Sequence, residues 1–336
     1  SFKNQFKVIK MNMRLQRYSM AEELLTALEH QYPNNEAIQL ERAKLYRRQN
    51  KFTKAIKVYS QLVKQYPNNL DYTYGLGTAY MAKRDFSTAI DHLLLVYEKD
   101  STHFNASYRL AQAFQELRIA DSTYVFVEKG KQFRPDHKNL NRIYIKQLHR
   151  DKAYKKAITV LKQQDELYPN EFFNQKMLAV CYYNLSDYQK AKRHFSKALD
   201  LDPDDHKSYT YLGHIDLKEG SYKQAYVNYF KALKTNRIPR GKEYYGLGMT
   251  SIALDNFIDA QMFLERAYDE NRRDPLVVFE LAKILDHNSM GGKVAYRYFK
   301  EYVQLYPQYN PQNTDYANNR IMEIKEAYFL RGEILD

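Results

Sequence analysis

The chain has 336 residues, a formal net charge of +12 at pH 7 and a hydrophobic content of 44%. Its single cysteine excludes an intramolecular disulfide framework and a zinc cluster built from cysteines. No run of eighteen apolar residues is present, so no segment is predicted to cross a membrane, and the positive charge favours acidic partners over basic ones.

A repeat with a period of about 34 residues runs through the sequence. Prolines recur on this period, and a series of alanines lies about twelve residues before the proline positions. A small residue at one phase and a helix breaker at another predict a stacked array of helix pairs. Such an array presents a long surface, which favours binding over catalysis in a closed pocket. The residues of the two series are Pro33, Pro67, Pro135, Pro169 and Pro203, and Ala21, Ala55, Ala89, Ala157, Ala191 and Ala225.

In chain order, residues 1–307 are predicted to form the array, in about nine units. The sixth unit shows the pattern most clearly. Its first helix is expected over Phe172–Asn184, and its second helix starts at Tyr188 and ends before Pro203, because proline cannot continue a helix. The predicted units begin near Phe2, Glu36, Leu70, Phe104, Lys138, Phe172, His206, Gly241 and Pro275.

The last part of the chain, 308–336, is predicted to be a linker and a capping helix. The polar stretch from Gln308 to Thr314 follows the last unit, and one apolar stripe then marks the helix. A stacked array needs such a helix to cover its exposed end. The stripe consists of Ile321, Ile324 and Tyr328.

Residues at fixed positions of the units form a family pattern. In the sixth unit they are Leu178-Ala179, Tyr182, Ala191, Phe195, Ala198 and Pro203. The third, seventh and eighth units repeat these positions with Leu76-Gly77, Tyr80 and Ala89, with Leu212-Gly213, Ala225, Tyr229 and Ala232, and with Leu247-Gly248, Ala260, Leu264 and Ala267. The pattern resembles the tetratricopeptide (TPR) family over nearly the whole chain. The resemblance implies an all-α, right-handed superhelical α-solenoid whose first helices line a concave groove, and a scaffold for protein–protein interaction.

We find no constellation of catalytic or metal-binding residues in the sequence. The nine histidines form no His-Glu-x-x-His motif, and Cys181 has no basic neighbour that would lower its pKa. The glycine pairs in Tyr74–Gly77 and Tyr245–Gly248 lack the third glycine of a dinucleotide-binding loop, and we interpret them as sites of close helix packing. The sequence therefore predicts a protein that is not an enzyme and needs neither a cofactor nor a metal ion.

Basic residues are concentrated in one window. Between Lys129 and Lys162 there are eleven Lys and Arg residues against two Asp residues. Three side chains of this window are spaced i, i+4, i+7 and so share one helical face. By the TPR pattern this face, with residues of the units before and after it, points into the groove, where it suits an acidic or aromatic peptide, a C-terminal carboxylate or an anionic polymer. The predicted partner-binding set is Tyr108, Gln112, Arg142, Lys146, His149, Lys176 and Tyr183.

Several alternatives remain open. The cations of this window could serve solubility alone. A second basic run is formed by Arg42, Lys44, Arg47 and Arg48 and is preceded by Lys10 and Arg14. Lys44 and Arg47 fall on positions that face the groove in the TPR pattern, but a solvated face is the favoured interpretation of this run. Binding of single-stranded nucleic acid or another polyanion is the alternative function, since helical repeats with basic and tyrosine residues suit phosphates and stacked bases. Self-association through the first unit is a further possibility. No three successive units carry the residue set with which some TPR proteins clamp chaperone carboxylates.

The chain starts with Ser1 inside the first expected helix and has no initiating methionine. A removed signal peptide would explain this start. We therefore favour an exported bacterial protein, periplasmic or associated with the cell envelope, and a trimmed cytoplasmic protein is the alternative.

Overall fold

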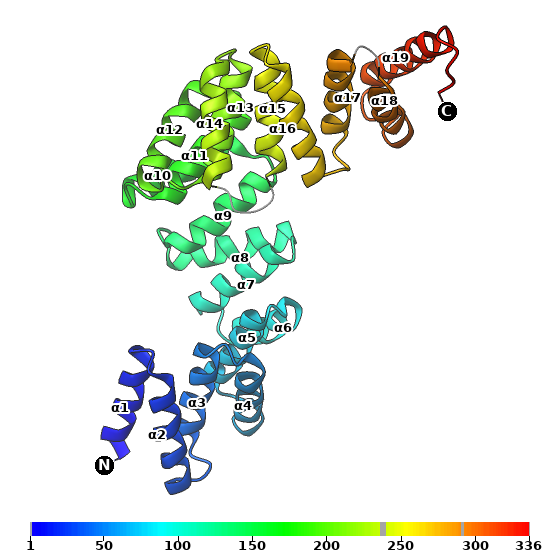
Figure 1. The fold of residues 1–336 in the computed structure, drawn as a ribbon. Helices are drawn as coiled ribbons and strands as arrows, with labels where there is room; N and C mark the ends of the chain where they lie inside the picture. The colour runs from blue at the N-terminus through cyan, green and yellow to red at the C-terminus, as the bar shows by residue number, and fades with distance from the viewer. Residues whose placement is uncertain (1, 236–239, 290–291, 336) are drawn as a thin grey trace. The chain divides into compact units, whose positions relative to one another are not determined.

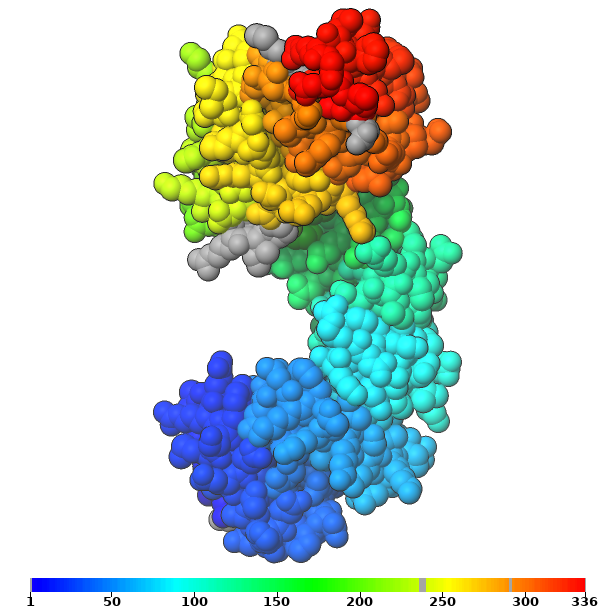
Figure 2. Space-filling view, turned by 45° about the vertical axis from the view of Figure 1, so that its right-hand side comes forward, coloured from blue at the N-terminus to red at the C-terminus, as the bar shows by residue number. Residues whose placement is uncertain are grey.

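The computed structural model describes residues 2–235, 240–289 and 292–335, and these ranges contain nineteen α-helices and no strand (Figure 1). The expected all-α solenoid of about nine helix pairs followed by one C-terminal helix is confirmed. Packing divides the chain into an N-terminal unit, Ser1–Leu167, and a C-terminal unit, Tyr168–Asp336. In the N-terminal unit, the side chains of consecutive helices form one continuous surface (Figure 2, blue to cyan).

The N-terminal unit contains α1 (Phe2–Arg14), α2 (Tyr18–Gln31), α3 (Glu36–Arg48), α4 (Phe52–Gln65), α5 (Leu70–Lys83), α6 (Phe86–Lys99), α7 (Phe104–Glu116), α8 (Ala120–Phe133), α9 (Lys138–Arg150) and α10 (Tyr154–Leu167). The C-terminal unit contains α11 (Phe172–Asn184), α12 (Tyr188–Leu201), α13 (His206–Lys218), α14 (Tyr222–Thr235), α15 (Gly241–Ala253), α16 (Phe257–Glu270), α17 (Pro275–Ser289), α18 (Lys293–Leu305) and α19 (Pro311–Phe329).

Several turns between helix pairs combine a proline with a capping residue. Pro33 lies in the turn after α2, and Asn35 then caps α3: its side-chain oxygen accepts hydrogen bonds from the backbone N–H groups of Ala37, at 3.0 Å, and Ile38, at 3.3 Å. Such caps satisfy N–H groups that the first helical turn leaves without partners. His137 caps α9 in the same way through Nδ1. The repeat therefore determines both where one pair ends and where the next begins.

The turns within helix pairs share a different feature. Eight of them in the described chain contain a residue in the left-handed backbone region, and only one of the eight is a glycine. Other residue types adopt this region at a cost of roughly 1 kcal/mol. The turn geometry is thus imposed by the packing of the two helices on either side. The eight residues, with their φ angles, are Gln16 (59°), Asn50 (58°), Arg84 (66°), Arg118 (61°), Lys152 (58°), Ser186 (60°), Gly220 (75°) and Asp255 (57°).

Small residues allow the helices of each unit to approach closely. The repeat alanines are fully buried. Gly75 in α5 faces the ring of Tyr59, and Gly246 in α15 faces the ring of Tyr229, so closely that an added β-carbon would overlap either ring. The expectation that these glycines serve helix packing is confirmed, because both lie inside helices and their space is filled by a neighbouring tyrosine.

The C-terminal helix α19 begins earlier than the polar stretch suggested. Asn310 accepts hydrogen bonds from the N–H groups of Gln312 and Asn313, and Pro311 occupies the first helical position, which suits its fixed φ. Ile324 is buried, and the other two residues of the predicted stripe pack against the same core cluster as α17 and α18. The helix thus covers the end of the last pair.

Candidate functional site

The two units differ in charge. The N-terminal unit contains 29 Lys and Arg residues against 17 Asp and Glu, whereas the C-terminal unit contains 23 of each. The whole formal charge of +12 therefore belongs to residues 1–167.

Tyr108 and Gln112 of the predicted set lie one turn apart on α7, and both are half-buried. Arg109 joins them: its Nη1 donates to Oε1 of Gln112 at 2.9 Å, and its guanidinium lies 5.2 Å from the centre of the Tyr108 ring. The two predicted residues therefore support a cation that the prediction did not include.

Arg142, Lys146 and His149 lie on α9. Lys146 is exposed, and the other two are half-buried. Burial lowers the pKa of His149 below its usual value, and its ring packs edge-on against Tyr154 at 5.7 Å. His149 is therefore neutral at pH 7, and the expected face of three cations is reduced to Arg142 and Lys146.

The last two predicted residues, Lys176 and Tyr183, belong to α11 of the C-terminal unit. Nζ of Lys176 lies 2.5 Å from Oδ1 of the buried Asp205. Burial alone would raise the pKa of Asp205, but hydrogen bonds from Lys176 and Ser208 hold it below its usual value. The charge of Lys176 is thus neutralised within its own unit. Tyr183 lines a cavity that is described below.

A cluster of cations surrounds a cavity of about 360 Å³ between α1 and α3. Its acidic member, Glu41, is 5% exposed, and its Oε1 lies 3.0 Å from Nζ of Lys44 and 3.7 Å from Nζ of Lys10. Five cations against one carboxylate leave this cavity strongly positive. The cavity is lined by Lys10, Met13, Arg14, Glu41, Lys44, Arg47 and Arg48.

A second cavity, of about 550 Å³, continues this surface along α5 and α7. Arg47 lines both cavities, and its Nη1 donates to Oγ1 of Thr78 at 3.2 Å. Arg84 and Arg109 line the second cavity together with Gln112 and one acid, Glu116. We call the seven cations that line the two cavities the N-terminal basic groove: Lys10, Arg14, Lys44, Arg47, Arg48, Arg84 and Arg109.

Sequence reasoning identified part of this groove and missed the rest. Lys44 and Arg47 of the second basic run line the first cavity, as their groove-facing positions in the repeat suggest, and so does Arg48, although a solvated face is the favoured interpretation of this run. Arg42 does not, because it is buried and its Nη2 pairs with Oε2 of Glu29 at 2.6 Å. Arg84 and Arg109 lie outside any basic run. The signal that could have found the groove is the placement of single cations on successive first helices of the repeat.

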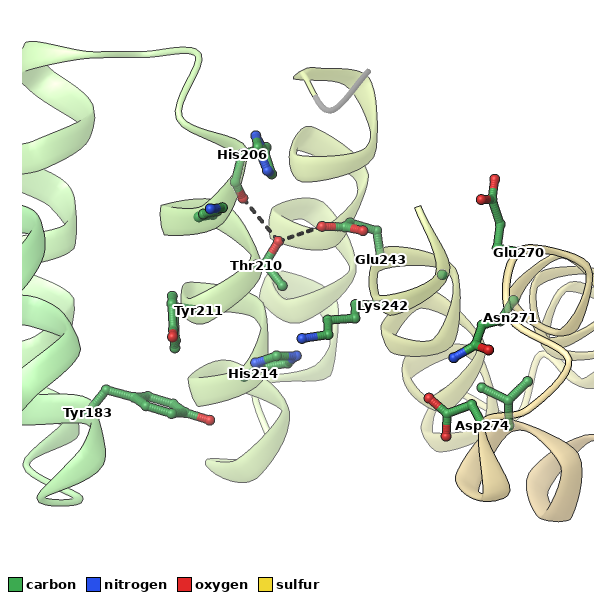
Figure 3. Close-up of a pocket in the computed structure, with 14 residues that line it drawn as sticks. Tyr183, His206, Thr210, Tyr211, His214, Lys242, Glu243, Glu270, Asn271 and Asp274 are labelled. Atoms are coloured by element: carbon green, nitrogen blue, oxygen red, sulfur yellow. Dashed lines mark hydrogen bonds between the residues drawn. The ribbon is translucent and has the colours of Figure 1, made fainter. Parts of the chain in front are cut away.

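The C-terminal unit contains a cavity of about 820 Å³, which we call the C-terminal cavity (Figure 3). Its walls come from α11, α13 and α15 on one side and from the end of α16 and the start of α17 on the other. This volume is typical of small-ligand and side-chain pockets. The main lining residues are Tyr183, His206, Lys207, Thr210, Tyr211, His214, Lys242, Glu243, Glu270, Asn271 and Asp274.

The floor of the C-terminal cavity holds a buried carboxylate. Glu243 is 4% exposed, and its Oε1 accepts a hydrogen bond from Oγ1 of Thr210 at 2.8 Å, as Figure 3 shows. The backbone oxygen of His206 lies 3.0 Å from the same hydroxyl, so the single Thr210 hydrogen is shared between this oxygen and the carboxylate. The carboxylate is therefore oriented by α13 although it is carried by α15.

Aromatic side chains form the neighbouring wall. The rings of Tyr183 and Tyr211 meet edge to face at 4.9 Å, and His214 lies 6.3 Å from the Tyr211 ring. Burial lowers the pKa of His214, and the nearby charge of Lys242 lowers it further. This wall is therefore uncharged at neutral pH.

The described ranges hold no group of three or more His, Cys, Asp or Glu side chains placed to bind a metal ion. Among the helices that the structure describes, none is long and apolar enough to span a bilayer. Cys181 is buried, and burial raises the pKa of its thiol to about 12, which agrees with the inert role expected for it.

Comparison with known proteins points to one family. Two models of the tetratricopeptide repeat match the chain, one over residues 12–69 and 40–104 and the other over 175–205. The anaphase-promoting complex subunit cut9 of Schizosaccharomyces pombe is 24% identical over 165 residues, which are 48% of this chain and 24% of that protein. The chain thus matches about a quarter of the length of this curated relative.

Solved structures show the same fold. The hetero-tetramer of Cut9 and Hcn1 from the APC/C superposes with a TM-score of 0.56 at 14% identity, over 90% of this chain and 59% of the other. PilW, a type IV pilus biogenesis factor, superposes with a TM-score of 0.55 at 16% identity, over 65% of this chain and 99% of the other. The chain therefore carries tetratricopeptide repeats over residues 12–104 and 175–205, and its stacked helix pairs have the fold of these solved structures.

Proposed function

We propose that this protein is a non-catalytic scaffold that binds an acidic, extended segment of a partner protein in the N-terminal basic groove. TPR proteins are generally scaffolds for protein–protein interaction, and one structural relative was solved as the Cut9–Hcn1 hetero-tetramer. The observation that carries the proposal is the pair of adjoining cavities that share Arg47.

The arrangement of the cations supports an extended ligand. They lie on or directly after α1, α3, α5 and α7, the first helices of four successive pairs. A compact anion could meet only a few of them, whereas an extended chain can contact several in turn. Seven cations against two carboxylates favour an acidic chain over a neutral one, since charge complementarity sets specificity and association rate.

The α9 residues Arg142 and Lys146 remain part of this proposal. They belong to the next first helix of the same unit, and Gln112 of the predicted set already lines the second cavity. A long acidic segment would reach them after the groove. A short one would be held by the groove alone.

The test measures binding of a fluorescein-labelled octa-glutamate peptide by anisotropy at 50 mM NaCl. In the double variant Lys44→Glu/Arg47→Glu, we expect affinity to fall at least tenfold, or about 1.4 kcal/mol, because two attractive charges become repulsive. The matched control is Lys57→Glu/Lys64→Glu, which changes the net charge equally on exposed positions of α4 in the same unit. We expect the control to stay within about threefold of the wild type.

Equal losses in the two variants would mean that general charge, not the groove, attracts the peptide. The same proteins are tested with a labelled oligo-dT of twenty nucleotides. Tighter binding of this strand, lost in the groove variant, would replace the acidic-segment proposal with the polyanion alternative.

A further inference from the structure

The C-terminal cavity has a chemistry opposite to that of the groove. Its carboxylates, Glu243, Glu270 and Asp274, outnumber its two lysines, and Glu243 is almost completely removed from water. A buried carboxylate is costly unless a donor or a cation compensates it. Among the described residues, the Thr210 hydroxyl, which the backbone oxygen of His206 also shares, is the one donor that Glu243 has, and no Lys or Arg pairs with it. The site therefore favours a ligand that carries a positive charge.

The opposite wall adds to the negative potential. Asp274 is half-buried at the start of α17, and Glu270 ends α16. Burial raises the pKa of the neighbouring Tyr245, and the charges of Glu280 and Asp274 raise it further. Of the cavity carboxylates, Asp274 thus acts as far as α15, the helix that carries Glu243.

The aromatic wall suits a basic side chain as well. Tyr183 and Tyr211 stand edge to face on the side of the cavity next to Thr210, as Figure 3 shows. Aromatic rings near a carboxylate attract a guanidinium or ammonium through the ring quadrupole and cover its methylene stem. His214 is uncharged at neutral pH, so it does not repel a cation there.

The two lysines do not occupy the place of the ligand. Lys207 and Lys242 are both exposed, and Figure 3 shows the side chain of Lys242 reaching toward His214 rather than toward the Glu243 carboxylate. The effect of Lys242 on the pKa of His214 agrees with this direction. The Glu243 carboxylate can therefore pair with a group from outside the described residues.

We propose that the C-terminal cavity binds a basic side chain, Lys or Arg, of an extended protein segment, with Glu243 as its ion-pair partner. The chain then has two sites of opposite charge preference, an acidic segment in the N-terminal basic groove and a basic one here. This second site is independent of the first, because its residues all belong to the C-terminal unit.

The experiment titrates full-length protein into a fluorescein-labelled octa-arginine peptide at 50 mM NaCl. Glu243→Gln removes the charge but keeps an oxygen for the Thr210 hydrogen bond, and we expect it to weaken binding at least fivefold. Asp274→Asn, which retains the side-chain acceptor for the backbone N–H of Leu276, is expected to weaken binding about threefold. The matched control is Glu326→Gln on an exposed position of α19 in the same unit, with a change of less than twofold.

Wild-type affinity in both Glu243→Gln and Asp274→Asn would overturn the proposal, as would an equal loss in the Glu326→Gln control. No binding of octa-arginine by the wild-type protein at 100-fold excess would overturn it too. The groove variant Lys44→Glu/Arg47→Glu separates the two sites. It should bind octa-arginine no more weakly than the wild type does, and a loss in that variant would place the peptide outside the cavity.

Discussion

The two units pack alike and differ in surface chemistry. In each, a tyrosine of a second helix is pressed against a helical glycine, Tyr59 against Gly75 and Tyr229 against Gly246. Yet one unit carries the entire formal charge of +12 and a basic groove, and the other is neutral and has a cavity in which acids predominate. The repeat thus constrains the residues between helices and leaves the exposed positions of the first helices free to vary.

Substitution of the helical glycines should disturb the packing that the two units share. We expect Gly75→Ala and Gly246→Ala each to destabilise the protein by about 1–3 kcal/mol, because the new β-carbon overlaps a buried tyrosine ring. Gly241→Ala is the control, since a β-carbon at this first residue of α15 meets its nearest atom at 3.5 Å, an ordinary contact. Urea-unfolding midpoints followed by circular dichroism measure all three. A raised midpoint for either packed glycine would show that its tyrosine can move aside.

The salt dependence of peptide binding should distinguish the two sites. Raising NaCl from 50 to 500 mM should weaken octa-glutamate binding at least tenfold, about 1.4 kcal/mol, because four of the seven groove cations are exposed and the other three only half-buried, so salt screens them. Octa-arginine binding should weaken less, since Glu243 is buried and buried pairs are screened less. Identical salt slopes for the two peptides would argue against this distinction.

Lowering the pH tests how one buried histidine of each unit contributes to stability. Burial lowers the pKa of both His149 and His214 below the usual value of about 6.5, so below that pH the unfolded chain binds more protons than the folded one. Their contribution to stability is present above pH 6.5 and is lost as pH falls toward the folded values. We expect His149→Gln and His214→Gln each to reduce the loss of stability between pH 7.5 and 5.5, by about 1 kcal/mol for a depression of one pKa unit. Thermal melts across this range test it, and unchanged profiles would contradict it.

The smallest expected effect concerns the turns within pairs. Lys152→Gly should stabilise the protein by about 0.5 kcal/mol, because glycine adopts the left-handed backbone at φ 58° without steric cost. Lys162→Gly, the same change at an exposed position in the interior of α10, should destabilise it by about 1 kcal/mol. The melting temperature of each variant is compared with that of the wild type. A lower melting temperature for Lys152→Gly would contradict the prediction.

The sequence predicted helix positions well because they depend on local signals. The first helix of the sixth unit was expected over Phe172–Asn184 and is found there, and the second begins at Tyr188 as expected. The left-handed turn positions were not predicted, because only Asn50, Gly220 and Asp255 are residue types that favour this region. The other five of the eight in the described chain are Gln16, Arg84, Arg118, Lys152 and Ser186. Their backbone conformation is imposed by the packing of the flanking helices, and it cannot be predicted from the residue at the turn.

The candidate sites were harder to predict because they join residues that are distant in sequence. Helical spacing placed Arg142 and Lys146 on one helix. It could not show that Asp205, 29 residues away, neutralises Lys176, or that Tyr154 helps to cover His149. Nor could helical spacing show that Arg47 lines the same cavities as cations of α1 and α7. These relations depend on how successive pairs stack.

The lone thiol has a practical consequence for measurement. Cys181 is the single cysteine of the chain, is fully buried and has a pKa of about 12, so it reacts slowly with maleimides at neutral pH. Cysteines introduced at Lys57 and Glu326 could therefore be labelled with a donor and an acceptor dye without first removing the native one. Energy transfer between the dyes would then report whether the distance between α4 and α19 changes when a peptide binds.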